Sequence, residues 1–199
     1  VNPMPPSISG YNEDIKGYEF NPEKAKELLA SSSYNGEELE LWAMPVARPY
    51  MPDGQKVAEA IQKNLADVGM NTKIVTYEWA TYLDKAKDGE ADLFLLGWTG
   101  DNGDADNFLY TLLDKDNIGS NNYTYFENEE VHNLLIAAQS EVDENKRNEL
   151  YKQAQVILHD EAPWVPLAHS TPLLGALSDV KGYIPHPTGS ESLEKVYFE

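Results

Sequence analysis

Strand and helix patterns alternate between residues 37 and 98, and this alternation constrains the fold more than any other feature of the sequence. Charged and apolar side chains alternate over 38–42, which is typical of a half-buried strand, whereas the apolar positions of 53–68 recur at helical spacing. The pattern continues with a strand at 72–77, a helix at 79–87 and a strand at 91–98. Connections of this kind join parallel strands through right-handed crossovers. The sequence therefore predicts a layered α/β fold with a mainly parallel central sheet.

The strand predicted at 91–98 is almost continuously apolar, which is typical of a strand covered on both faces. Capping signals and helical spacing predict further helices outside this region. Asn21 can cap a helix that begins at Pro22. Two longer helices are predicted at about 127–141 and 144–161.

The two ends of the chain have different patterns. Residues 2–6 are rich in proline, which predicts an extended arm that is not part of the core. Residues 164–168 are predicted to form one more strand. Residues 172–199 contain only short strand-like pieces at 173–177, 180–184 and 196–198, and we expect their order to depend on neighbouring segments. The start at Val1, without an initiator methionine, favours a fragment or processed product of a longer protein.

Composition excludes several classes of function. Asp and Glu number 34 against 15 Lys and Arg, so the net charge of −19 repels nucleic acid and anionic membrane surfaces. The chain has no cysteine, and its four histidines lack metal-ligand spacing, so we expect no metal and no cofactor. Its apolar runs fall short of the roughly 20 residues that span a bilayer. These features predict a soluble chain that binds no nucleic acid.

The densest polar cluster, WTGDNGDADN at residues 98–107, directly follows the predicted third strand. Ligands of open α/β sheets bind outside the carboxyl ends of the strands, so a site is expected here. A calcium loop beginning at Asp101 or Asp104 would need Glu at its twelfth position, which is Leu112 or Lys115. A glycosidase pair of Asp101 and Asp104 is a weak alternative, because acidic residues are frequent throughout the chain. No catalytic residue is predicted.

Arg48 lies in a proline-fixed loop after the first predicted strand. A loop arginine is usually a solvated surface charge, but its guanidinium can bind a carboxylate through two parallel hydrogen bonds. If the first and third strands are neighbours, Arg48 and Asp101 share one edge of the sheet. A cation and an anion at one cleft would match a zwitterionic ligand.

Several segments of the sequence resemble the dipeptide-binding branch of the solute-binding proteins of ABC importers. These segments are residues 42–50, 74–79, 97–108, 145–147, 151–155, 168–171 and 180–183. The resemblance implies the layered helix–sheet–helix lobe of a type II periplasmic-binding protein. It implies that residues 1–171 form the large C-terminal lobe and that 172–199 return to an N-terminal lobe absent from this chain.

The same resemblance assigns roles to the site residues. Asp101 would bind the α-ammonium of a short peptide and Arg48 its α-carboxylate, while Trp98, Thr99 and Gly100 complete the ligand-binding set. It implies an extracytoplasmic protein, periplasmic or lipid-anchored, that delivers peptides to ABC permease subunits and is not an enzyme. Glutathione, haem or a nickel complex is the alternative ligand, and a carbohydrate-active enzyme is a remote alternative.

Overall fold

A three-stranded parallel sheet organises the first half of the computed structural model, which describes residues 1–171, 173–186, 188–189 and 191–199. Its strands are β1 (Leu39–Trp42), β2 (Thr72–Val75) and β3 (Leu93–Phe94), in the order β2-β1-β3. The connecting helices are α2 (Gly54–Asp67) and α3 (Trp79–Lys87). The predicted strand–helix–strand–helix–strand order is confirmed, as is the parallel pairing.

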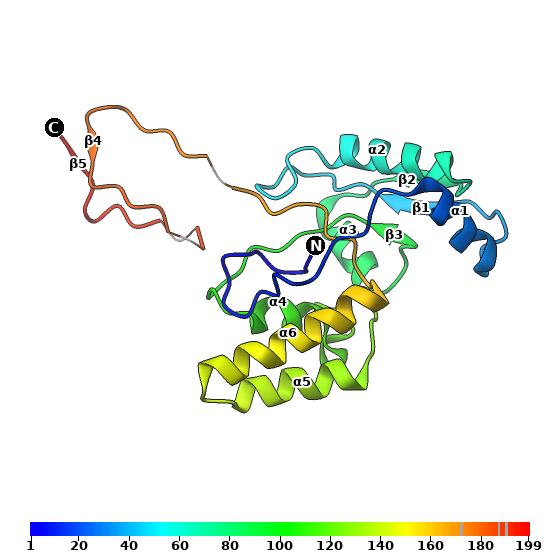
Figure 1. Ribbon diagram of the computed structural model, residues 1–199. Coiled ribbons are helices and arrows are strands. Elements are labelled where there is room, and N and C mark those ends of the chain that lie inside the picture. Colours follow the sequence, from blue (N-terminus) through cyan, green and yellow to red (C-terminus); the bar gives the residue numbers. More distant parts are fainter. Residues whose placement is uncertain (172, 187, 190) are drawn as a thin grey trace.

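The helices α2 and α3 cover opposite faces of the sheet (Figure 1). The chain steps from β1 to β2 on one side and returns past β1 to β3 on the other, so crossovers of one hand place the helices on different faces. Asp53 caps α2 by accepting the Lys56 N–H at 3.1 Å, and Glu78 caps α3. Trp42 and Tyr82 are fully buried between these layers.

The strand predicted at 91–98 is wrong in length and in burial. It is assigned as a strand only at 93–94, where both residues are half-buried, and among the described residues it pairs with β1 alone. Leu95 still donates its N–H to the Trp42 carbonyl at 3.1 Å, and its carbonyl accepts the Tyr82 hydroxyl at 2.7 Å. The ladder thus ends at Leu95, where the Tyr82 hydroxyl of α3 satisfies the Leu95 carbonyl.

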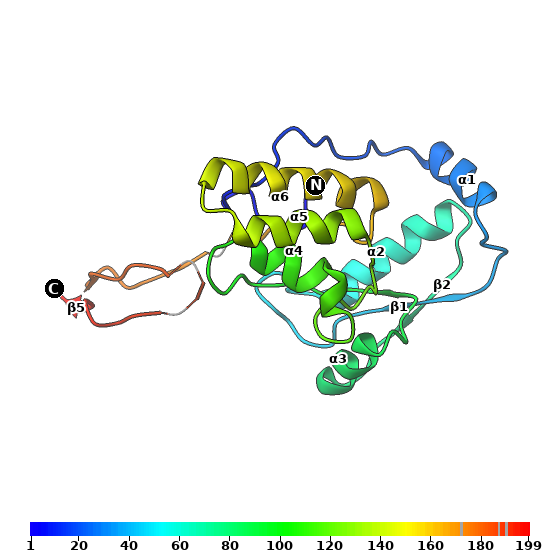
Figure 2. The same cartoon turned by 90° about the horizontal axis from the view of Figure 1, so that it is seen from below.

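A helical layer packs beside the sheet and forms a second core (Figure 2). It consists of α4 (Asp106–Leu113), the short η1 (Lys115–Asn117), α5 (Glu129–Ser140) and α6 (Glu144–Glu161). The predictions for α5 and α6 are confirmed, as is that for the separate helix α1 (Pro22–Ser31), capped by Asn21. Helix α4 was not predicted, although Leu109, Leu112 and Leu113 bury its inner face.

The N-terminal arm is part of the core, which contradicts its prediction as a peripheral segment. Met4 is fully buried against α4, α5 and α6, and Asn2 is also buried. The Gln155 amide of α6 ties the arm down, since it donates to the Gly10 carbonyl at 2.7 Å and accepts from the Asn2 side chain at 3.1 Å. The arm is also not extended as predicted, because residues 3–4 bend and the Ile8 N–H closes a turn on the Pro5 carbonyl at 3.1 Å. Contacts remote in sequence decide its burial.

The C-terminal part of the chain extends away from both cores in Figures 1 and 2. The strand predicted at 164–168 is wrong, because these residues are irregular, and no strand forms at 173–177. The later pieces form a short antiparallel pair, β4 (Val180–Lys181) with β5 (Tyr197–Phe198). Pro172, the predicted boundary of the tail, lies outside the described residues. None of the helices in the described ranges combines the length and the hydrophobicity that a membrane span requires.

Candidate functional site

Two loops leave the carboxyl ends of neighbouring strands. β1 and β3 pair in parallel, with Trp42 opposite Phe94, so the loop after β1 and the chain after β3 begin at one edge of the sheet. The chain turns to opposite sides of β1 in reaching β2 and β3, so this edge is the topological switch point where open α/β sheets bind ligands. The structure therefore brings the Arg48 and Asp101 loops to one edge.

The Arg48 loop is a tight turn with its charge exposed. Arg48 and Met51 exchange backbone hydrogen bonds of 3.0 and 2.9 Å, which closes the loop. The Arg48 guanidinium lies 4.9 Å from the centre of the Trp79 ring, a cation–π contact with the first residue of α3. Among the described residues it forms no ion pair with a carboxylate. The guanidinium is thus oriented by an aromatic ring while its charge stays available.

Tyr50 connects the two loops. A Cβ added to Gly97 would overlap the Tyr50 ring, so the absence of a side chain at 97 lets the ring lie directly against the chain after β3. Burial raises the pKa of the Tyr50 hydroxyl, and the nearby Arg48 charge lowers it by less. Tyr50 therefore stays neutral at physiological pH and acts as a packing contact between the loops.

The Asp101 loop is organised by Asn107 in the first turn of α4. The Asn107 Oδ1 accepts the Trp98 Nε1–H at 2.9 Å and the Asp101 backbone N–H at 3.0 Å, and its Nδ2 donates to the Asp101 carboxylate at 3.3 Å. Trp98 is half-buried against the helical core, whereas Asp101 is exposed. Thr99 is exposed and Gly100 is half-buried beneath the Phe108 ring. The carboxylate of Asp101 thus faces outward from a fixed base.

Asp104 has a different role from Asp101. The Arg147 guanidinium holds both Asp104 carboxylate oxygens at 2.8 Å and also donates to the Tyr151 hydroxyl at 2.8 Å. Partial burial raises the pKa of Asp104, but hydrogen bonds from Arg147 and the Asp106 N–H outweigh it and hold the pKa below its usual range. Asp104 is therefore an ionised group that stabilises the structure. Because it is paired with Arg147, it is not a free second carboxylate for a glycosidase pair with Asp101.

The sequence did not assign roles to Tyr50, Asn107 or Arg147. Asn107 falls inside the polar cluster, so its position was noted, but only the structure identifies it as the residue that contacts both Trp98 and Asp101. Arg147 carries a sequence signal only as a member of the family-like segment 145–147.

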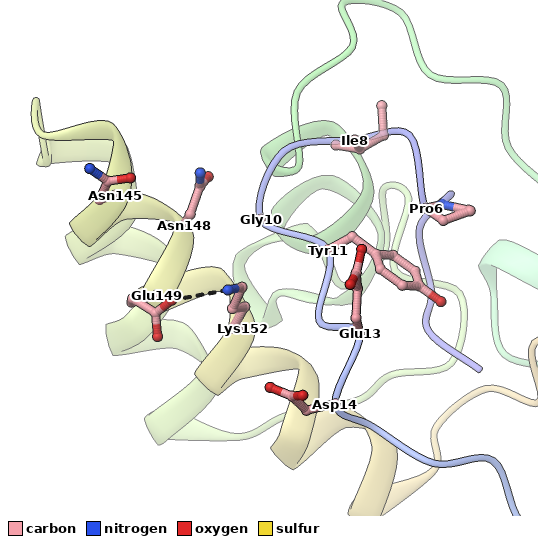
Figure 3. Close-up of a pocket in the computed structure, with 10 residues that line it drawn as sticks. All are labelled: Pro6, Ile8, Gly10, Tyr11, Glu13, Asp14, Asn145, Asn148, Glu149 and Lys152. Atoms are coloured by element: carbon pink, nitrogen blue, oxygen red, sulfur yellow. Dashed lines mark hydrogen bonds and ion pairs between the residues drawn. The ribbon is translucent and has the colours of Figure 1, made fainter.

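A surface hollow of about 500 Å³ lies elsewhere, between the N-terminal arm and α6 (Figure 3). Its lining includes Glu13, Asp14 and the ion pair of Lys152 with Glu149, and none of the predicted site residues. Within the described residues, Asp114, Asp116 and His132 are the group whose spacing could hold a metal ion. A hydrogen bond of 3.1 Å from His132 Nδ1 to the buried Asp114 accounts for this arrangement without an ion.

Comparison with known proteins identifies relatives of the whole chain. The model of the bacterial extracellular solute-binding proteins, family 5 Middle, matches residues 1–120. The dipeptide-binding protein of Escherichia coli is 47% identical over 201 residues, covering 100% of this chain and 37% of that protein. The heme-binding protein A of Haemophilus influenzae is 46% identical, covering 96% of this chain and 35% of that protein.

A solved structure of similar architecture is the periplasmic binding protein DppA of Helicobacter pylori in complex with the peptide STSA. It superposes with a TM-score of 0.87 at 40% identity, covering 100% of this chain and 38% of that one. This match confirms the predicted layered lobe of a type II periplasmic-binding protein. The chain spans little more than a third of the relatives that it matches. With a family model that matches more than half of its residues, the chain belongs to family 5 of the bacterial extracellular solute-binding proteins.

Proposed function

We propose that this chain is part of the extracytoplasmic substrate-binding component of an ABC importer, which captures dipeptides or short peptides by their charged ends. The observation that carries the proposal is the pair of exposed charges, Arg48 and Asp101, on two loops at one edge of the sheet. Neither forms an ion pair among the described residues, and the Tyr50 contact with Gly97 joins their loops. The proposal agrees with the names of the dipeptide-binding relative and of the peptide complex.

In this proposal each terminal charge of the peptide meets a fixed counter-charge. Arg48 binds the α-carboxylate through its guanidinium, and Asp101 binds the α-ammonium. Enclosing a zwitterion removes water from both charges, so each must be paired to be tolerated. Trp98, Thr99 and Gly100 line the same pocket, and water-mediated contacts let it accept different side chains.

The remainder of the protein completes the site in this proposal. Residues 1–171 form most of a C-terminal lobe, and 172–199 return to an N-terminal lobe that closes over the peptide. The many exposed apolar side chains of the tail, among them Leu173, Leu177 and Phe198, agree with a segment that packs against such a lobe. The closed form then docks on the transmembrane permease subunits, outside the cell membrane, as a periplasmic or lipid-anchored protein without catalytic activity.

Calorimetry on the whole protein tests the proposal. Asp101→Asn and Arg48→Ala should each weaken binding of the dipeptide alanylalanine at least tenfold, because truncating one partner of a desolvated charge pair costs about 2–5 kcal/mol. Asp160→Asn removes an exposed charge from α6 and serves as the control, with unchanged affinity expected. Wild-type affinity in both site variants would refute the charge-pair model. The isolated 199 residues, with one face of the cleft, should bind the dipeptide weakly.

Haem is the second candidate ligand, because the heme-binding protein A of Haemophilus influenzae is nearly as similar to this chain as the dipeptide-binding relative. N-acetylated alanylalanine separates the possibilities, since it lacks the ammonium that Asp101 would bind. If alanylalanine binds and its N-acetylated form does not, the ligand is a peptide held by its ammonium group. Tight binding of hemin that Asp101→Asn leaves unchanged would favour haem. Glutathione and nickel complexes are tested in the same way, by their binding to the wild type and to Asp101→Asn.

A further inference from the structure

We propose that Asn107 is a positioning residue of the ligand site, which fixes the Asp101 carboxylate and the Trp98 ring and thereby sets affinity for the cationic end of the ligand. This inference rests on the proposed function and adds a residue that never touches the ligand. Its basis is the set of three hydrogen bonds made by one side-chain amide, to two ligand-site residues.

The hydrogen-bond pattern fixes which way the Asn107 amide points. The Trp98 Nε1–H and the Asp101 backbone N–H can only donate, so the atom that faces both must be the amide oxygen. With two lone pairs occupied, that oxygen is saturated. The amide nitrogen is then left to face the Asp101 carboxylate, at 3.3 Å from Oδ2. The orientation of Asn107 therefore follows from its neighbours.

Asn107 can act as a support because it belongs to a rigid element and Asp101 does not. Asn107 lies in the first turn of α4, whose Leu109 and Leu113 are at most 1% exposed. Asp101 lies in an irregular segment between Gly100 and Gly103, and Gly103 has a positive φ of 72°. A carboxylate on such a segment loses conformational freedom when a ligand binds, and a preformed hydrogen bond reduces that loss.

The bond to Asp101 also selects its outward-facing state. Asn107 donates to one carboxylate oxygen, Oδ2, and among the described residues no other side chain forms a hydrogen bond or ion pair with that carboxylate. The remaining acceptor positions stay open to a ligand ammonium. The same Asn107 oxygen orients the Trp98 ring, so one substitution disturbs both the charged contact and the adjacent aromatic surface.

The first test is a double-mutant cycle in the whole protein, with alanylalanine as the probe and calorimetric displacement to measure weak binding. Asn107→Ala should lose about tenfold in affinity, and it should lose clearly less when Asp101→Asn is already present, because only the contact with Trp98 is then left to disturb. Asn102→Ala is the matched control. Asn102 belongs to the same loop, but among the described residues its side chain bonds only the Asp104 N–H, so the affinity of this variant should stay near wild type.

The second test keeps the structural contacts and changes only the donor. In Asn107→Asp the oxygen that accepts from Trp98 and Asp101 remains, while a second carboxylate oxygen faces Asp101. Two adjacent carboxylates retain a proton, and binding of a cation releases it. The ratio of variant to wild-type affinity should therefore rise between about pH 5 and about pH 7.5, a window below the titration of the peptide amine. A flat ratio would show that the side chain at 107 does not act on the Asp101 carboxylate, and would overturn the positioning role.

The outcomes separate this inference from the proposed function. Normal dipeptide binding by Asp101→Asn would overturn the ammonium contact itself. If Asp101→Asn binds the dipeptide weakly but Asn107→Ala binds it as well as the Asn102→Ala control, the positioning role alone is overturned. Affinity losses of the two substitutions that are fully additive would overturn it as well. If Asn107→Ala does not fold, as judged by its thermal melting, the pH ratio of Asn107→Asp decides the question.

Discussion

Replacing Arg147 by methionine should destabilise the chain by about 2 kcal/mol. The substitution keeps most of the apolar stem of the side chain. It removes the two hydrogen bonds to Asp104, the one to Tyr151 and the one from Nε–H to the Ala138 carbonyl. Fully exposed ion pairs contribute about 0.2–1 kcal/mol, and breaking a buried pair costs about 3–5 kcal/mol. The side chains of Arg147 and Asp104 retain 30% and 31% of their exposure, which places this pair between the two cases.

Urea unfolding and thermal melting of the 199-residue chain measure this effect. A loss of this size lowers the melting temperature by about 4–8 °C in a chain of this length. Lys152→Met is the matched control on the same helix, because Lys152 pairs with Glu149 at 3.1 Å while both side chains are more exposed, at 38% and 62%. The control should change stability by at most about 0.5 kcal/mol.

The pH dependence of stability tests whether the ion pair of Asp104 with Arg147 is the cause of this loss, because it predicts the direction of the change with pH. The pKa of Asp104 lies below its ordinary value of 3.8, because the hydrogen bonds of Arg147 and Asp106 outweigh partial burial. A depressed carboxyl pKa stabilises the fold above the unfolded pKa and loses that contribution as pH falls through the folded one. The stability difference between wild type and Arg147→Met should thus be constant above about pH 5 and shrink below about pH 4.

Equal effects of Arg147→Met and Lys152→Met, or a difference that persists unchanged into acid, would refute this reasoning. The double variant Asp104→Asn with Arg147→Met should recover part of the lost stability, because it leaves no half-buried charge without its partner.

Two further substitutions test the contacts that hold the site edge together. Tyr82→Phe should cost about 1–2 kcal/mol in urea unfolding, since the fully buried hydroxyl donates to the Leu95 carbonyl and accepts the Leu95 N–H; an unchanged midpoint would show that β3 does not depend on it. Gly97→Ala should displace the Tyr50 ring and lower dipeptide affinity of the whole protein about tenfold by moving the Arg48 loop. Gly17→Ala, where the added Cβ would make an ordinary contact of 3.6 Å with Val1, is the control with unchanged affinity expected. Equal affinity of the two variants would contradict the role of Tyr50.

Local signals predicted the elements that carry their own caps. Asn21, Asp53 and Glu78 each accept backbone N–H groups at the start of a helix, and the helices there begin where the sequence indicated. Helix α4 escaped prediction because Ala105 provides no side-chain cap and its first turn lies inside the polar cluster. The burial of Met4 escaped because its partners lie on helices more than 100 residues away.

The apolar run at 91–98 shows a different limit. Its composition is that of a strand with both faces covered, but composition cannot state whether a second strand lies beside it. Here the Leu95 N–H still bonds to the Trp42 carbonyl of β1, and the Leu95 carbonyl accepts the Tyr82 hydroxyl of α3 rather than an N–H of another strand. Beyond this end the irregular chain passes Gly97, which lies against the Tyr50 ring, and enters the Asp101 loop.

Two aspartates of similar sequence context, Asp101 and Asp104, acquire opposite roles through partners that the sequence could not assign to them. Arg147 lies on α6, so only the three-dimensional structure reveals that its charge is paired with the ionised Asp104. Asn107 contacts Asp101 without cancelling its charge. At the edge of the sheet, the Asp104 and Arg147 charges therefore offset each other, and Arg48 and Asp101 remain as one cation and one anion. If these two residues form the proposed ligand site, this local balance favours a zwitterion over a simple cation in a chain with a net charge of −19, because Arg48 provides the positive charge that a carboxylate needs.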